Sequence, residues 1–477
     1  MTYLGLLLTC VAGWLLLPRD YEWGLTAKLS FAFAAGAAAI SVEMFVLDLT
    51  GIGWGRVTVL LPWIALAGWR GYRDSAALLD PIWPWRMRMP GLTSHVLVAV
   101  VLVPVFVWMP FERAMPLTSW DAWAIWMLKA KAFYADGTIS GYLARHDEFV
   151  GQPGYPLLVP LYAAFLYVME GGVADGAAKV ISPCFFLALL GVFHHFVRRW
   201  TPPVPALAFT AMLAGIPMVD HLGFELAGYA GTALSLYFVA AAGFVYEWFR
   251  EGDLVNLAGA CLAATAAAWT KNEGQFFLAA ILVLAALQLF RTREKHPVLN
   301  WAWLAVPGLI LGPWALVRGS HGIEAAGFTP LIDFEGGLFG IALRRLLSMG
   351  FDTQLYNLTF LLLLASIVCA LVLRMRFLFW ILPGLAAWQF AGALLAYATG
   401  RNEIQWWLGT SAGRILAQIA PLALMAPAVV YGEWTGRGEA AESPATETVK
   451  RTAPASKGRR RKGRGWSTRT RVGGSES

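Results

Sequence analysis

Long, uninterrupted apolar runs constrain this chain more than any other feature of its sequence. A helix needs roughly 20 apolar residues to cross about 30 Å of hydrocarbon. Inside that layer each backbone polar group must be bonded within the segment, as it is in a helix. The runs are rich in Leu, Ala and Phe and show no strand-like alternation, so we predict an all-α polytopic membrane protein. They lie at about 1–17, 26–48, 54–69, 93–110, 156–170, 177–197, 204–217, 228–248, 254–270, 275–290, 300–317, 355–373, 377–398 and 414–431.

The composition supports this class. Of the 477 residues, 58% are hydrophobic and 14% are charged, whereas a soluble protein carries about 25% charged residues. The net charge of +7 does not indicate nucleic-acid binding, because the excess is concentrated in the C-terminal tail. The cysteines all fall in apolar runs without metal-ligand spacing, so we expect no structural disulfide. They are Cys10, Cys184, Cys261 and Cys369.

Basic residues set the expected orientation. The tail, 436–477, is rich in small and polar residues and then basic, so we expect it to be disordered and cytoplasmic. We count the apolar runs as membrane crossings, starting from this cytoplasmic tail and going toward the N-terminus. Every short basic loop between runs then lies on the cytoplasmic side, provided that 156–170 does not cross the membrane. That run is also short for a span, and we interpret it as re-entrant or interfacial. The prediction is about 13 crossings of the plasma (inner) membrane, with the N-terminus outside.

Three regions follow from this arrangement: N-terminal transmembrane helices over 1–92, a catalytic transmembrane region over 93–435, and the basic tail. Most polar residues of interest then fall in loops on the outer side of the membrane. These loops are 111–155, 218–227, 271–274, 318–354 and 399–413.

The first outer loop opens with an amphipathic helix. Apolar and aromatic residues recur at helical spacing over 119–134, while Lys129 and Lys131 lie off that stripe, which suits a helix at the membrane surface. Asp121 stands at its start, either as an N-cap or as a functional acid. Further on, the pair Asp147-Glu148 is best interpreted as solvated loop charge. Pro and Gly then form a turn before the next apolar run.

The order of these segments resembles the GT-C superfamily of membrane glycosyltransferases, which includes protein mannosyltransferases and the aminoarabinose transferase of lipid A. In that family the first large outer loop carries an acid near its start, juxtamembrane helices, and a His-Pro-Pro-Leu-like turn. Trp120-Asp121 matches the acidic position, and Gly154-Tyr155-Pro156-Leu157 matches the turn. The family often has Asp-Glu where this chain has Asp121-Ala122.

Three later segments extend the resemblance. Residues 224–231, Phe-Glu-Leu-Ala-Gly-Tyr-Ala-Gly, match a family segment that often carries an acid before a transmembrane helix. Residues 270–274 resemble the Thr-Lys-x-x-Gly end of a later helix. Residues 406–416 resemble the Thr-Ser-x-x-Arg approach to the last helix. The matches are spread over 93–431.

The resemblance implies transfer of a sugar from a polyprenyl-phosphate donor to a lipid, glycan or protein acceptor on the outer (periplasmic) face. Asp121 would be the general base. Arg414 and Lys271 at outer helix ends would bind the phosphate, with snorkelling to lipid headgroups as the alternative for both. Glu273 is a possible partner of Lys271, and Arg401 is a weaker candidate for substrate binding.

Glu225, Asp220 and His221 are candidates for positioning the acceptor or tuning the base. The family's acid at 231 is replaced by Gly231, so a second carboxylate would have to come from Asp220 or Glu225. A second acid beside Asp121 could hold Mg²⁺ or Mn²⁺. Two other functions fit the same spans: a multi-span transporter, which would place charges near the bilayer midplane, and a lipid-linked polymer ligase or polymerase.

Overall fold

A computed structural model of the chain describes residues 1–18, 24–73, 114–148, 151–292, 298–323, 334–400 and 403–436. These residues form helices and no strand. The N-terminal helices are α1 (Thr2–Leu16), α2 (Leu25–Leu49) and α3 (Arg56–Arg73). The next group comprises a π-helix η2 (Ala122–Trp126), α6 (Met127–Asp136), α7 (Ile139–Ala144), a 3₁₀ turn η3 (His146–Glu148), α8 (Leu158–Glu170) and α9 (Asp175–Lys179).

The middle of the chain contains α10 (Ile181–Trp200), α11 (Pro203–Ala214), α12 (Pro217–Gly223), α13 (Gly231–Glu251), α14 (Leu254–Thr270) and α15 (Asn272–Arg291). The remainder consists of η4 (Val298–Ala305), α16 (Val306–Ser320), α17 (Gly336–Gly350), α18 (Thr353–Tyr356), α19 (Thr359–Val372), η6 (Phe377–Trp380), α20 (Ile381–Thr399) and α21 (Ile404–Trp434). The predicted all-α class is confirmed for the described residues.

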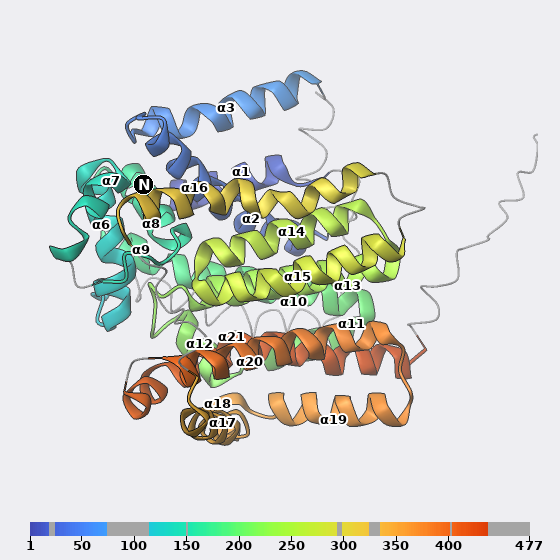
Figure 1. Ribbon diagram of the computed structural model, residues 1–477. Coiled ribbons are helices and arrows are strands. Elements are labelled where there is room, and N and C mark those ends of the chain that lie inside the picture. The colour runs from blue at the N-terminus through green and yellow to red at the C-terminus, as the bar shows by residue number, and fades with distance from the viewer. Residues whose placement is uncertain are drawn as a thin grey trace, which may run out of the picture.

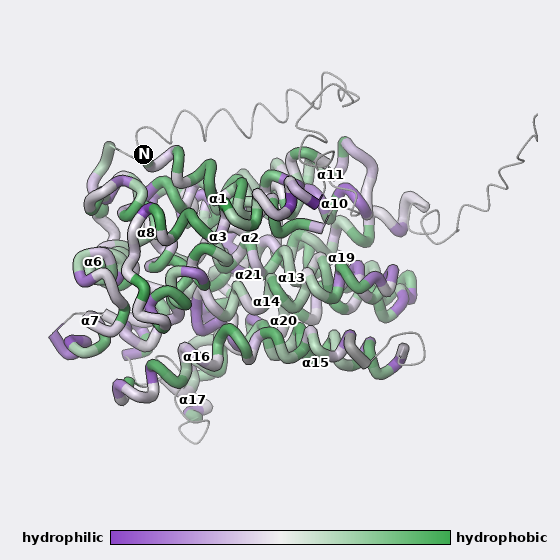
Figure 2. Tube along the Cα trace, turned by 90° about the horizontal axis from the view of Figure 1, so that it is seen from above, coloured by the Kyte–Doolittle hydropathy of each residue, from purple (hydrophilic) through white to green (hydrophobic). Residues whose placement is uncertain are grey.

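The long helices form one bundle with roughly parallel axes, and the short helices α6 to α9 gather at its left end in Figure 1. Hydrophobic residues predominate along the bundle, and hydrophilic stretches gather toward its ends (Figure 2). Among the described residues, seven helices are long and apolar enough to cross a membrane, or eight if the bent pair α11–α12 is one span. The finer prediction of about 13 crossings is not confirmed, because several other apolar helices are short and the run 93–110 lies outside the described residues.

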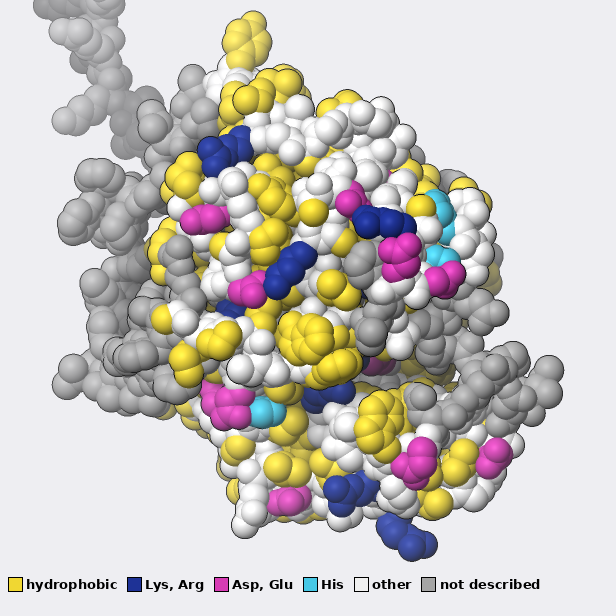
Figure 3. Space-filling view, turned by 90° about the vertical axis from the view of Figure 1, so that its left-hand side faces the viewer, with side chains coloured by type: hydrophobic (Ala, Val, Ile, Leu, Met, Phe, Trp, Pro, Cys, Tyr) yellow, Lys and Arg dark blue, Asp and Glu magenta, His cyan; other side chains and the backbone are white. Residues whose placement is uncertain are grey.

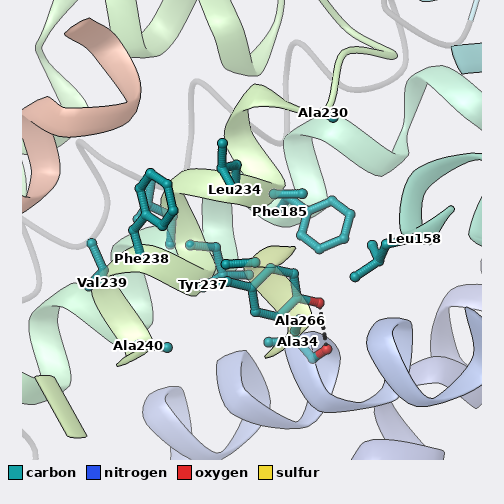
Figure 4. Close-up of a cluster of buried hydrophobic side chains, with 14 of the residues drawn as sticks. Ala34, Leu158, Phe185, Ala230, Leu234, Tyr237, Phe238, Val239, Ala240 and Ala266 are labelled. Carbon is teal, nitrogen blue, oxygen red and sulfur yellow. Dashed lines mark hydrogen bonds between the residues drawn. The ribbon is translucent and has the colours of Figure 1, made fainter. Parts of the chain in front are cut away.

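The core lies at the meeting of α2, α8, α10, α13 and α14. There, Phe185 and Tyr237 pack close to Leu158 and Ala34, and the Tyr237 hydroxyl donates to the Ala34 carbonyl at 2.9 Å (Figure 4). A buried phenol needs such a partner, because an unbonded polar group in an apolar core costs free energy. This contact therefore joins α13 to α2 inside the bundle.

The segment 156–170 contains α8, which has 13 residues and is about 20 Å long. Its first residue, Leu158, lies in the core, while Glu170 at its end binds the N-terminal amine at 3.3 Å. The Tyr162 hydroxyl donates to Thr9 of α1 at 3.0 Å. α8 is therefore joined to the N-terminal segment both in its middle and at its end. The re-entrant or interfacial interpretation of 156–170 stays a prediction.

A set of ion pairs around Glu247 lies at the end of the bundle opposite to the short helices α6 to α9. Glu247 of α13 is fully buried and binds Arg199 at 2.9 Å and Arg250 at 3.3 Å. It also accepts a hydrogen bond of 2.6 Å from the Trp200 indole. Buried carboxylates are stable only when paired in this way. This network ties α10 to α13 away from the polar loops that contain the candidate site.

Candidate functional site

Asp121 and Arg414 form an ion pair between the first large loop and the last helix. Arg414 Nη1 donates to Asp121 Oδ2 across 293 residues of sequence. Arg414 Nε also donates to the Thr410 carbonyl of its own helix at 2.9 Å. The two charged side chains remain 25% and 20% exposed respectively, so a ligand from outside can reach both. The structure thus brings together the expected base and one of the expected phosphate-binding cations.

Tyr229 lies under this ion pair. Its ring centroid is 5.0 Å from the Arg414 guanidinium carbon, and its hydroxyl accepts from the Asp121 backbone N–H at 3.2 Å. Burial raises the pKa of the Tyr229 phenol, the Asp121 carboxylate raises it further, and Arg414 lowers it. Tyr229 therefore contacts both residues of the ion pair, Arg414 through its ring and Asp121 through its hydroxyl.

The side chain of Asp121 does not cap its helix. No backbone N–H donates to it, and its carboxylate faces Arg414 instead. The N-cap alternative from the sequence is therefore wrong for the side chain. The reason is tertiary: the guanidinium is a charged donor, which a carboxylate binds more strongly than a neutral amide.

Lys271 and Glu273 pair across the turn between α14 and α15, as the sequence suggested. Lys271 is 19% exposed and Glu273 is 32% exposed. The turn is anchored from α20, where Gln389 Nε2 donates to the Glu273 carbonyl at 3.1 Å. The second candidate cation is thus also held by a carboxylate that remains accessible.

The charges of both ion pairs act on Tyr155 of the turn 151–157. Burial raises the pKa of the Tyr155 phenol; the carboxylates of Glu273 and Asp121 raise it further, and Arg414 lowers it. Arg318, near the end of α16, donates to the Gly154 carbonyl of the same turn at 3.4 Å.

Glu225 and His221 form a neighbouring exposed pair, with His221 Nδ1 and Glu225 Oε2 2.6 Å apart. The His221 side chain is 34% exposed and the Glu225 side chain is 69% exposed. Ser119 donates to the Glu225 carbonyl at 3.3 Å, which joins their loop to the segment before Asp121. Asp220 is exposed beside them. Figure 3 shows acidic, basic and histidine side chains gathered on this left-hand face of the bundle.

The site differs from the sequence expectation in several residues. Arg401 lies outside the described residues. Lys129 was placed off the apolar stripe of its helix, but its side chain is fully buried, so the simple surface-helix prediction is wrong at this position. Tyr229, Tyr155, Lys129 and Arg318 were not predicted as site residues. The sequence held a signal for Arg318, because this residue directly follows the apolar run 300–317 at the end expected to lie outside. Arg414 and Lys271 lie in the same way at the ends of their own apolar runs.

Within the described residues, no group of three or more His, Cys, Asp or Glu side chains is arranged to hold a metal ion. The acids of the site are instead divided among separate partners: Asp121 with Arg414, Glu273 with Lys271, and Glu225 with His221. The arrangement offers two cations for an anionic group and an accessible carboxylate for a proton.

Comparisons of the chain with models of protein families, with curated proteins and with solved structures find no match. The chemistry of the site therefore has to be argued from its own residues.

Proposed function

We propose that this chain is a membrane glycosyltransferase that moves a sugar from a polyprenyl-phosphate-linked donor to an acceptor on the outer face of the membrane. The observation that carries the proposal is the contact between Asp121 and Arg414. Sugar transfer from a lipid phosphate needs a base for the acceptor and a cation for the leaving phosphate, side by side. The resemblance of the outer-loop segments to the GT-C superfamily assigns these same two residues.

The charges of Asp121, Arg414 and Lys271 give each of these residues a role in the proposed reaction. The acceptor hydroxyl attacks the anomeric carbon while Asp121 takes its proton. The bond from that carbon to the phosphate oxygen breaks, and the polyprenyl phosphate leaves with the electron pair. Arg414 and Lys271 stabilise the charge on the leaving group. Attack opposite the phosphate inverts the anomeric centre, as the family resemblance implies.

Arg414 has to change partners in this scheme. In the unliganded protein it binds the Asp121 carboxylate; in the donor complex the phosphate competes for the same guanidinium. Both partners are partly exposed, so the exchange requires no unfolding. Donor binding would then release Asp121 to act as the base, and Glu273 would exchange on Lys271 in the same way.

The first test is sugar transfer by the purified full-length chain in nanodiscs, with a panel of radiolabelled polyprenyl-phosphate sugars and membrane extract as acceptor. We expect transfer from one donor and a loss of at least about 100-fold in Asp121→Asn. Asp147→Asn is the matched control, because Asp147 lies on the same loop and is 91% exposed. It should transfer at the wild-type rate.

Two results would contradict the proposal. One is wild-type protein that is folded, as judged by its thermal unfolding midpoint, but neither transfers nor hydrolyses any donor. The other is Asp121→Asn with the turnover of the control variant. Uptake of a solute into proteoliposomes by the same inactive protein would favour the transporter instead.

A further inference from the structure

Lys129 of α6 is a lysine that the bundle buries completely. Its side chain is 0% exposed, although α6 is not among the candidate spans. Lysine is almost never fully buried unless it is paired. Among the described acids on the elements that pack against it, Asp136 binds Arg145 and Glu170 binds the N-terminal amine. Neither acid is paired with Lys129.

The Lys129 ammonium instead contacts the turn 151–157. Its Nζ donates to the Gln152 carbonyl and lies 5.6 Å from the centroid of the Tyr155 ring. The same carbonyl accepts the Tyr155 backbone N–H at 3.0 Å. Tyr155 also stacks on Trp126, with ring centroids 5.5 Å apart and planes 19° apart. Lys129 therefore contacts the backbone and the ring that define this turn.

The turn matters because Tyr155 stacks on Trp126 of η2, the helix that begins next to Asp121. The charges of Asp121, Glu273 and Arg414 all act on its phenol. The helix that carries Lys129 continues directly from η2, which begins next to Asp121. One buried cation thus connects the segment of the proposed base to the turn 151–157.

We propose that Lys129 is a positioning residue, which holds the turn 151–157 and Tyr155 in place beside Asp121 through the Gln152 carbonyl. It touches none of the reacting groups itself. The claim that Lys129 holds the turn depends only on the contacts described above. The claim that Lys129 affects turnover rests on the proposed glycosyltransferase function. Its neighbour Lys131 differs, because it is partly exposed and pairs with Asp175 at 2.8 Å.

Burial lowers the pKa of Lys129 to about 7. The titratable side chain next to the ammonium is that of Tyr155, and the Tyr142 hydroxyl of α7 lies beside the same turn at Gly151. The protonated amine binds a carbonyl more strongly than the neutral one. The turn is therefore held most firmly below pH 7 and is loosened as the proton leaves above it.

The test compares wild type with Lys129→Met and with Lys131→Met as the matched control on the same helix. Hydrogen–deuterium exchange of the peptide covering 151–157 is measured in nanodiscs. We expect exchange at the Tyr155 amide to be about tenfold faster in Lys129→Met and unchanged in Lys131→Met. Wild-type exchange in Lys129→Met overturns the proposed hold on the turn. Lys129→Gln, which keeps a neutral donor, replaces the Met variant if that protein does not fold.

Kinetics then test the role in turnover. We expect kcat of Lys129→Met to fall about tenfold while KM for the donor changes less than twofold, since Arg414 and Lys271 are intact. Wild-type kcat should decline as pH rises through about 7, and this decline should be absent in the variant. If Lys129→Met shows faster amide exchange in the turn but keeps the kcat and the pH profile of the wild type, the positioning role is overturned. If wild type transfers no sugar, the proposed function fails, and the exchange result still decides whether Lys129 holds the turn.

Discussion

At the scale of single residues, the site is built from charges that already have partners. Arg414 binds Asp121 and Lys271 binds Glu273, so the unliganded protein carries carboxylates where a donor phosphate is expected to bind. A partly exposed ion pair contributes little net stability. Its partners can therefore be exchanged at a small cost in free energy.

This exchange makes a counterintuitive prediction for Asp121→Asn. The variant should lose transfer and yet bind a short-chain polyprenyl phosphate more tightly, by about threefold to tenfold, because the internal competitor for Arg414 is gone. Isothermal titration calorimetry with the sugar-free lipid phosphate measures this. Arg414→Gln should weaken binding instead, and Asp147→Asn should leave it unchanged. Weaker binding by Asp121→Asn would show that Asp121 attracts the donor rather than competing with it.

At the scale of elements, the turn between α14 and α15 depends on Gly274. A Cβ atom added there would lie 2.0 Å from the Ala267 carbonyl oxygen of the preceding helix. No real Cβ tolerates such an approach, so α15 can start this close to the last turn of α14 only with glycine. This gives the Thr270–Gly274 motif a structural reason, since the same turn carries Lys271 and Glu273.

Gly274→Ala should therefore push α15 away from α14 and destabilise the protein by about 1–3 kcal/mol. The free energy of unfolding is measured by denaturant titration in detergent. Gly384→Ala in α20 is the control, because a Cβ there meets nothing within 4 Å. If Gly274→Ala and Gly384→Ala have equal free energies of unfolding, the turn between α14 and α15 accommodates the added Cβ without moving either helix.

At the scale of the whole molecule, the bundle has two unlike ends. One holds the Asp121, Lys271 and Glu225 pairs, and the other holds the network around Glu247. The basic residues of the second end are those expected on the cytoplasmic side. The polar loops that contain the candidate site lie at the first end, which the proposal places outside.

Thiol labelling tests this orientation in a background whose four cysteines are replaced by alanine. Asp147→Cys, at the site end, should react with a membrane-impermeant maleimide in intact cells, because an outer loop faces the medium. Asp253→Cys, in the exposed turn between α13 and α14, should react only after permeabilisation. The reverse pattern would place the site on the cytoplasmic side.

The sequence by itself determined the class of this protein and the pieces of its site. Continuous apolar runs leave only helices, and an acid or cation at a helix end is conspicuous in so apolar a chain. The pairing of Lys271 with Glu273 could be predicted because the two residues are neighbours in sequence. The amphipathic pattern around Lys129, however, predicted a surface position for a side chain that is fully buried.

Only the tertiary structure decided which of these residues meet. Asp121 and Arg414 are 293 residues apart, and no local pattern encodes a contact formed when the first loop folds against the last helix. The roles of Tyr229, Tyr155 and Lys129 have the same origin, because each depends on a ring or carbonyl supplied by another segment. Periodicity reports which face of a helix is apolar, whereas burial of a charge depends on whether the packed chain offers it a partner.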